Sequence, residues 1–376
     1  MIDLNMNNVV VILYRAETAH SALDQNYTGE KPFCMKGKYS GYNRSYSYLI
    51  EKLKALGLKP KFTTTSDILG SGHFKSYWTF KKGKWERHSD EIHTKVIFDK
   101  FTPNTPQEVT LLKTAAGCKC IKTYNSRFIN KLFGDKLNTY EALKKHCIPT
   151  VKLESFSKIA IEKATKNLRK IMRGRNKKLS THGILKDRTG GGGYGIHKIN
   201  LLDTNFKRLA KLNAGDQKDK MEIDYVLQPF IDCEAPYNNK SAQVSDLRLI
   251  YAGKKIKQAY VRTAADDDFR CNTSQGGNIY YLSPNEVPED IRLKANEILD
   301  FMGESVELEH QLFALDFVST PNDEIYLMEG NCNPGIIWTK GNQADEDKTK
   351  ELISIISNGL KQMIQNQKGD LKCQIC

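Results

Sequence analysis

The sequence contains a glycine-rich loop preceded by a lysine, and residues of these types at this spacing could bind phosphate. Lys186 ends an expected strand and is followed by Gly190, Gly191, Gly192 and Gly193. Successive glycines let backbone N–H groups approach phosphate oxygens, because no Cβ stands in the way. The pattern is neither a Walker A motif nor a dinucleotide-binding turn, since no Lys-Ser/Thr follows and a strand is expected next. The loop predicts a phosphate site or, alternatively, a flexible connection.

Oxygen ligands are expected to meet on two neighbouring strands near the end of the chain. Glu329 and Asn331 are two residues apart on one strand, so they point to the same face, and the intervening turn brings Asp316 opposite them. Such hard oxygen donors suit magnesium held with nucleotide phosphates. Carboxylates in apolar strands are costly to bury unless cations neutralise them. Either a metal ion or a salt bridge is therefore expected.

Several cationic and amide side chains lie on or just after predicted strands. They are Arg248, Arg262, Arg270 and Asn272. Arginines lining a cleft are suited to bidentate binding of phosphate or carboxylate. Arginines on an exposed strand surface are the alternative.

The elements that must position these residues alternate in an α/β pattern. In the first 125 residues, strands are expected at 9–13 and 95–99, a helix at 46–56, and a hairpin around Lys82 and Gly83 within residues 70–90. Further on, helices are expected at 135–146, 158–172, 201–212, 288–301 and 348–367. The remaining strands are expected at 183–186, 195–198, 225–231, 313–319 and 325–331, with two more between 246 and 262.

Composition and charge restrict the class of protein. The chain has 376 residues, 39% of them hydrophobic, and a net charge of +13. No apolar run approaches the roughly 20 residues that cross a bilayer, and the N-terminus indicates a strand rather than a signal peptide. Nine cysteines without a repeating framework indicate reduced thiols. We therefore expect a cytoplasmic protein with no membrane partner.

Part of the positive charge is concentrated between residues 157 and 188. This stretch holds eleven Lys or Arg against Glu162 and Asp187. A solvated helix face is one interpretation, and attraction of an anionic partner is the other. No nucleic-acid-binding motif is present in the sequence, so nucleic acid is a minor option.

Taken in chain order, the motifs resemble one family. The segments are "GDKLNTYEALKKHCIPT" (134–150), "ILKDRTGGGGYGI" (184–196), "YVLQPFID" (225–232), "DLRLIYAGKKIKQAYVR" (246–262), "FRCNTSQGG" (269–277), "ALDFV" (314–318) and "MEGNCNPG" (328–335). Their order and spacing resemble the ATP-grasp superfamily, especially the RimK-type carboxylate–amine ligases, whose relatives include bacterial glutathione synthetases. The resemblance covers about residues 125 to 360.

The resemblance implies a role for each matching residue. Lys136 and Lys186 would contact the ATP phosphates beneath the glycine loop. Gln228, Pro229 and Phe230 would meet the adenine, and Asp246 would reach the ribose. Asp316, Glu329 and Asn331 would hold Mg²⁺, with two ions expected and Mn²⁺ as an alternative. Arg270 and Asn272 would lie at the transferring phosphate, and Arg262 near the acceptor carboxylate.

Four residues depart from the family's usual pattern. Pro229 replaces an acid in the segment that meets the adenine, and Asp187 replaces a proline after the phosphate lysine. Cys271 and Cys332 stand where small polar residues are common. Because the joining of a carboxylate to an amine by such ligases needs no thiol nucleophile, Cys332 is interpreted as structural.

The resemblance also implies the domains. We expect an α/β (α+β) protein with the ATP-grasp fold: an N-terminal α/β domain on the substrate side at 1–125, a central subdomain with the glycine lid at 126–230, a C-terminal subdomain with the metal site at 231–367, and a tail at 368–376.

The implied function is that of an ATP-dependent ligase. It would join a carboxylate to an amine through an acylphosphate, with an amino acid or an acidic peptide or protein as substrate. A small-molecule kinase of the inositol phosphate type and a non-catalytic ATP-binding module are the alternatives. The oligomeric state is left open.

Overall fold

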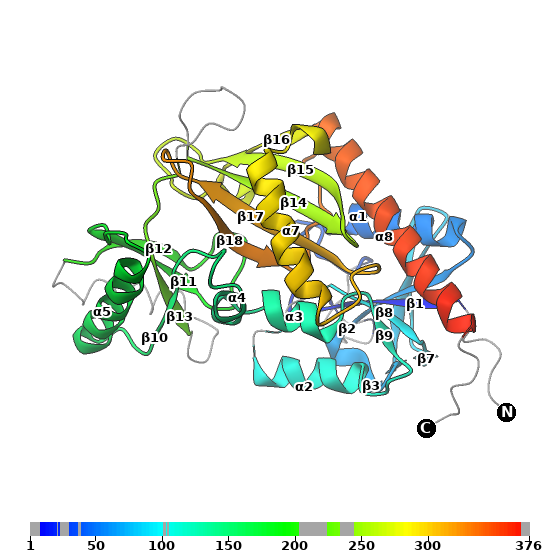
Figure 1. Cartoon of the computed structure of the whole chain (residues 1–376). Helices are drawn as coiled ribbons and strands as arrows, with labels where there is room; N and C mark the ends of the chain where they lie inside the picture. Colours follow the sequence, from blue (N-terminus) through cyan, green and yellow to red (C-terminus); the bar gives the residue numbers. More distant parts are fainter. Residues whose placement is uncertain are drawn as a thin grey trace. The chain divides into compact units, whose positions relative to one another are not determined.

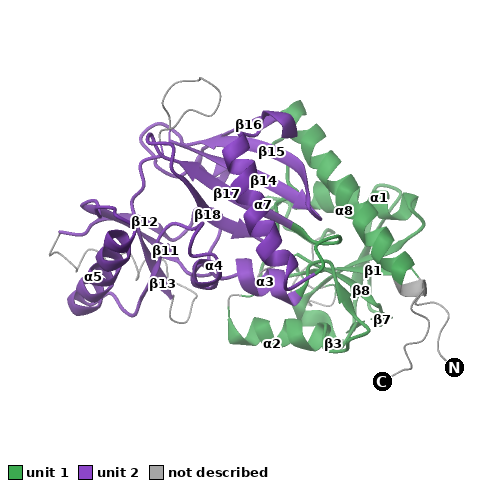
Figure 2. Cartoon of the chain, in the orientation of Figure 1, with its two compact units in different colours: residues 1–126, 307–312, 333–376 green, residues 127–306, 313–332 purple. Residues whose placement is uncertain are grey.

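The chain divides into two compact units. The computed structural model describes residues 8–20, 22, 30–36, 39–100, 103, 105–202, 224–233 and 244–369. Residues 1–126, 307–312 and 333–376 form unit 1, and residues 127–306 and 313–332 form unit 2 (Figure 2). The predicted subdomain 126–230 thus lies in unit 2 apart from residue 126. The predicted subdomain 231–367 is divided, because residues 307–312 and 333–367 belong to unit 1 and the rest of it to unit 2. The predicted tail lies outside the described residues from 370 on.

The described part of unit 1 contains a six-stranded sheet in the order β6-β5-β2-β1-β8-β9. Strand β1 (Val9–Tyr14) is parallel to β2 (Lys59–Thr64) and β8 (Val96–Asp99), and β8 is parallel to β9 (Lys122–Thr123). All six residues of β1 are buried, as a continuous apolar run predicts for a strand covered on both faces. The predicted strands at 9–13 and 95–99 are confirmed.

The predicted hairpin in unit 1 is confirmed. Strands β5 (Tyr77–Lys81) and β6 (Lys84–His88) pair antiparallel around Lys82 and Gly83, whose φ angles are 50° and 78°. Two consecutive positive φ angles match the right-handed twist of the flanking strands. A second, three-stranded sheet among the described residues comprises β3 (Ile68–Gly70), β4 (His73–Phe74) and β7 (Ile92–His93).

Helices α1 (Tyr42–Ala55), α2 (Pro106–Ala115) and α8 (Gln343–Gly369) belong to unit 1. Helix α8 begins five residues before the predicted start, because Asn342 Oδ1 accepts a hydrogen bond from the Asp345 N–H and caps the first turn. None of the helices described here combines the length and hydrophobicity needed to span a bilayer.

Cys118 and Cys120 form a disulfide, so the expectation of reduced thiols is wrong for this pair.

Unit 2 contains a four-stranded antiparallel sheet among its described residues. Its order is β10 (Val151–Leu153), β13 (Tyr225–Pro229), β11 (His182–Asp187) and β12 (Ile196–Asn200). Helix α5 (Lys158–Gly174) packs its apolar side on this sheet (Figure 1), with Ile161 and Leu168 in one buried cluster with Leu185. This confirms the helix predicted at 158–172 and the strand pair around the glycine loop. The helix predicted at 201–212 lies outside the described residues from 203 on.

The other described sheet of unit 2 has five strands. They are β16 (Asn278–Leu282), β15 (Lys255–Thr263), β14 (Ser245–Ala252), β17 (Leu312–Ser319) and β18 (Ile325–Asn331), in that order. Helix α7 (Glu289–Gly303) lies along this sheet (Figure 1), where the Lys294 ammonium donates to the Ile325 carbonyl at 2.8 Å. The predicted mixed α/β class is confirmed.

Helices α3 (Arg127–Phe133) and α4 (Lys136–Ala142) lead into the four-stranded sheet. Asp135 caps α4 by accepting hydrogen bonds from the N–H groups of Leu137 and Asn138. The predicted end at residue 146 is wrong, because residues 146–148 pair with β18 instead. The Leu327 N–H donates to the His146 carbonyl at 2.7 Å, and Ile148 donates to Leu327 at 3.3 Å.

Candidate active site

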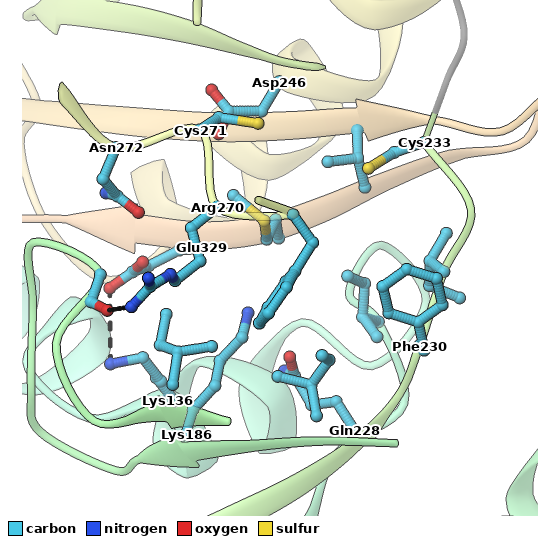
Figure 3. Close-up of a pocket in the computed structure, with 18 of the residues that line it drawn as sticks. Lys136, Lys186, Gln228, Phe230, Cys233, Asp246, Arg270, Cys271, Asn272 and Glu329 are labelled. Carbon is cyan, nitrogen blue, oxygen red and sulfur yellow. Dashed lines mark hydrogen bonds and ion pairs between the residues drawn. The ribbon is translucent and has the colours of Figure 1, made fainter. Parts of the chain in front are cut away.

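Most of the predicted site residues line one pocket within unit 2 (Figure 3). They come from both of its sheets, from the glycine loop, from the start of α4 and from the segment after β15. The predicted residues that line the pocket are Lys136, Lys186, Gly190, Gly191, Gly193, Gln228, Pro229, Phe230, Asp246, Arg262, Arg270, Asn272 and Glu329. Gly192, Asp316 and Asn331 are not among its lining residues.

The glycine loop between β11 and β12 is held at its start by Asp187. The Oδ1 atom of Asp187 accepts hydrogen bonds from the N–H groups of Thr189 and Gly190, both at 3.0 Å. Aspartate readily stabilises such a turn through its own side chain. The departure from the family's proline at this position therefore has a structural role, since Asp187 folds the loop back over the pocket.

The tip of the glycine loop lies against the segment that carries Arg270 and Asn272. Gly193 has a φ of +76°, and a Cβ there would lie 2.8 Å from Asn272 Oδ1. The Ser274 hydroxyl donates to the Gly192 carbonyl at 2.5 Å. Sequence reasoning did not single out Ser274, because this contact joins residues 82 positions apart. The loop is thus closed down on its neighbour, and only glycine fits at its tip.

Two lysines approach the same end of the pocket. The Lys136 ammonium donates to the Gly190 carbonyl at 2.5 Å and lies 3.5 Å from Glu329 Oε1. Lys186 is 7% exposed. Burial lowers the pKa of Lys186; Glu329 opposes this shift and Lys136 adds to it. A buried ammonium beside a second one attracts anions strongly, because a bound anion compensates both charges.

Asp316 lies in a buried network of arginines next to the pocket. Its Oδ1 accepts from Arg248 Nε at 2.6 Å, and its Oδ2 accepts from Arg248 Nη2 at 2.5 Å and Arg262 Nη2 at 2.8 Å. Burial raises the pKa of Asp316, but the two guanidinium groups outweigh it and lower the pKa to about 2. The salt bridge that the sequence left open as the alternative to a metal is therefore present at Asp316.

Arg262 connects a second carboxylate to this network. Its Nε and Nη2 donate to the two oxygens of Asp246 at 2.7 and 3.0 Å. Both side chains are at most 5% exposed. Arg262 thus binds two carboxylates, and of these Asp246 lines the pocket. Contact of Asp246 with a ribose and of Arg262 with an acceptor carboxylate stay predictions.

Glu329, Asp316 and Asn331 share one face of the β17–β18 pair. Asp316 is the register partner of Glu329, and Asn331 follows two residues later on the same strand. Glu329 is half-buried and lines the pocket. This oxygen donor set fits Mg²⁺, with Glu329 as the ligand that faces the pocket. Asp316 accepts two hydrogen bonds at Oδ2 and one at Oδ1, so the guanidinium groups already use three of its roughly four acceptor positions.

The opposite end of the pocket is apolar. Figure 3 shows Lys136, Arg270 and Glu329 together and Phe230 with Gln228 away from them. Ile231, which follows Phe230, lies in one hydrophobic cluster with Ile148, Val318 and Met328, and all four line the pocket. Ile184, another lining residue, is the register partner of Gln228. The Lys198 ammonium lies 3.6 Å from the centroid of the Phe230 ring. Sequence reasoning missed these apolar residues, because strand alternation does not tell which neighbour a buried side chain faces. A charged end and an apolar end suit a nucleotide.

The closed loop leaves little room. The cavity measures about 90 Å³, well below the ~300 Å³ at which small-molecule sites begin. The glycine loop covers this cavity, so a ligand as large as a nucleotide would require the loop to move.

Solved structures resemble this chain over nearly its whole length. D-alanyl-alanine synthetase A from Vibrio cholerae gives a TM-score of 0.56 at 13% identity, covering 94% of this chain and 99% of that one. A RimK domain ATP-grasp protein from Sphaerobacter thermophilus gives a TM-score of 0.53 at 13% identity, covering 93% of this chain and 98% of that one. A RiPP-associated ATP-grasp ligase from Chryseobacterium gregarium was solved in complex with ADP and a leader and core peptide. It gives a TM-score of 0.53 at 15% identity, covering 95% of this chain and 97% of that one. No protein family model and no curated protein sequence matches the chain.

The chain therefore has the ATP-grasp fold, as the resemblance of its motifs predicts. At these low identities the likeness concerns the architecture alone, and a function has to be argued from the pocket.

Proposed function

We propose that this protein is an ATP-dependent carboxylate–amine ligase. The observation that carries the proposal is the pocket of unit 2, where Lys136 and Lys186 meet Glu329 beneath a closed glycine loop. Phe230 and its apolar neighbours at the other end suit an adenine. ATP with Mg²⁺ would supply the phosphoryl group that turns an unreactive carboxylate into an acylphosphate.

The residues of the chain would orient the reactants and offset charge. Lys136 and Lys186 would hold the phosphates, and Arg270 with Asn272 would face the oxygens of the transferring group. Arg270 is itself oriented by Asp268 at 2.8 Å. Glu329, Asp316 and Asn331 would hold the metal. The closed glycine loop would exclude water, which otherwise hydrolyses the acylphosphate before the amine displaces phosphate.

The proposed substrates are an amino acid or peptide carboxylate and an amine. The similar structures include a D-alanyl-alanine synthetase and a ligase solved with a leader and core peptide. The net charge of +13 supports an acidic peptide or protein as one substrate.

The reaction can be tested by measuring ADP release over a panel of amino acids and acidic peptides. We expect ADP and free phosphate to form only when a carboxylate and an amine are supplied together, with one new amide bond per ADP. ADP formation with phosphate retained on a hydroxyl compound would select a kinase instead. Absence of nucleotide binding would contradict both activities.

The metal ligands can be tested with Glu329→Ala. We expect it to lower ADP formation at least a hundredfold at saturating Mg²⁺, because removal of a transition-state charge contact commonly costs that much. Glu324→Ala is the matched control. Glu324 directly precedes the strand that carries Glu329, and its carboxylate forms an ion pair with Lys177 at 2.6 Å outside the pocket. Equal activity of Glu329→Ala and the parent would show that the metal assignment is wrong.

A further inference from the structure

A second cluster of ligand-type side chains lies in unit 1, outside the pocket. Strands β4 and β7 pair antiparallel, with His73 opposite His93 and Phe74 opposite Ile92. Phe74 and Ile92 are buried in one hydrophobic cluster, 0% and 8% exposed. Because side chains alternate along a strand, the histidines point to the other face. Glu91 lies two residues before His93 and joins them on that face.

The three side chains converge. His73 Nε2 lies 2.6 Å from Glu91 Oε2. The two imidazole rings stack with centroids 4.1 Å apart and planes inclined by 16°. One ligand atom from each residue lies within 4.8 Å of the other two. In a tetrahedral zinc site, with Zn–N bonds of 2.0–2.1 Å, ligand atoms are about 3.3 Å apart. Small side-chain rotations are therefore enough to close the set around an ion.

The backbones that carry the cluster are anchored to the sheet. Gly72, directly before His73, has a φ of +63°, and a Cβ there would lie 2.3 Å from the Thr94 carbonyl oxygen. The Thr94 N–H donates to the Gly72 carbonyl at 2.8 Å. The buried Thr94 hydroxyl donates to the Val9 carbonyl of β1 at 2.8 Å. Both histidines are thus adjacent to residues held in fixed positions, so their backbones are preorganised for a shared ligand.

We propose that His73, Glu91 and His93 bind a divalent first-row transition ion such as Zn²⁺, with a fourth coordination position open to water. Two imidazoles and a carboxylate are donors that zinc uses in open sites, whereas Mg²⁺ prefers oxygen ligands alone. This site is separate from the proposed magnesium site, which lies in unit 2.

The test is a Zn²⁺ titration of the metal-free full-length chain by calorimetry, without nucleotide or Mg²⁺. We expect one more bound ion for the wild type than for His93→Ala. Glu91→Gln should weaken binding at this site at least tenfold, because it keeps the shape of Glu91 but removes the charge. His182→Ala, which changes a histidine of unit 2, should leave this ion in place.

Co²⁺ can separate this site from thiol sites such as the exposed Cys34, which lies 3.2 Å from His20 Nε2. A thiolate ligand gives an intense near-ultraviolet charge-transfer band, whereas imidazole and carboxylate ligands do not. We expect weak visible bands without that intense band, and their loss in His93→Ala. Circular dichroism of the metal-free variants checks their folding. Equal Zn²⁺ stoichiometry and affinity in the wild type, His93→Ala and Glu91→Gln would overturn the proposal.

Discussion

At the scale of single residues, the pocket of unit 2 concentrates buried charge. Asp246 and Asp316 are joined through Arg262, and Arg248 completes the network. Each of the four side chains would be costly to bury alone, and the network balances two positive with two negative charges. Lys186 has a lowered pKa beside this network. An anionic ligand bound next to Lys186 would oppose this shift, because a nearby negative charge favours the ammonium form.

We expect Asp316→Asn to reduce the free energy of unfolding by about 3 kcal/mol at neutral pH, because it leaves two buried arginines with one carboxylate. The effect should depend on pH. The pKa of Asp316 is lowered from 3.8 to about 2 in the folded chain. A carboxyl group lowered in this way stabilises the fold above its unfolded pKa and loses that contribution as the pH falls through its folded pKa.

The measurement is urea unfolding of the wild type and Asp316→Asn at several pH values. The difference between them should shrink by about 2 kcal/mol as the pH falls from about 5 toward 2. Asp300→Asn, an exposed carboxylate of α7, is the control and should change little. A difference that does not vary with pH would contradict the assigned pKa of Asp316.

At the scale of elements, the glycine hairpin of β11 and β12 is the part of the site that would have to move to admit a nucleotide. Its loop is fixed at the start by Asp187 and at the tip by Ser274. The fixed start preserves the turn. At the tip, the short hydrogen bond from Ser274 is joined by two long contacts of 3.5 Å. They run from Gln275 Nε2 to the Gly192 carbonyl and from Arg270 Nη1 to the Gly193 carbonyl, and contacts of this kind are broken at modest cost. We therefore expect the tip of the hairpin to open more readily than its start.

We expect Ser274→Ala to open the loop more often. Loss of a hydrogen bond worth about 1 kcal/mol should speed amide hydrogen exchange in residues 189–195 about fivefold. It should also raise ADP formation without amine, because water reaches the acylphosphate more easily. Ser283→Ala, in the capping box of the turn at Pro284–Glu286, serves as the control. Unchanged exchange in residues 189–195 would mean that Ser274 does not hold the loop.

At the scale of the whole molecule, the chain passes between the two units several times. Residues 307–312 and 333–376 belong to unit 1, and the stretch between them, 313–332, belongs to unit 2. That stretch carries Asp316, Glu329 and Asn331. The predicted metal ligands therefore lie on a segment of unit 2 that is preceded and followed along the chain by residues of unit 1.

The net charge gives a prediction at this scale. If the substrate is an acidic peptide, its KM should rise severalfold between about 0.1 and 1 M salt, where the Debye length falls from about 10 to about 3 Å. The KM for a neutral amino acid used as the other substrate should change much less, since long-range electrostatic attraction contributes little to its binding. Steady-state ADP release at each salt concentration measures both. Equal salt dependence for the two substrates would contradict recruitment by charge.

Local elements were predictable because their signals lie within a few residues. The apolar run of β1 indicates a buried strand, the pair Lys82 and Gly83 indicates a tight turn, and Asp135 marks the start of α4. The end of α4 was not predictable, because residues 146–148 leave the helix to pair with a strand about 180 residues further on. The competing partner is distant in the chain and close only in the fold.

The amino-acid sequence by itself determined which chemical groups the site contains and the strands that carry them, since alternation, turns and caps follow from backbone geometry. Only the tertiary structure decided their partners. It paired Asp316 with Arg248 and Arg262, placed Ser274 on the glycine loop, and brought His73 and His93 together across two short strands. The physical reason is that charges and hydrogen bonds act over a few ångströms, and packing sets which residues approach that closely.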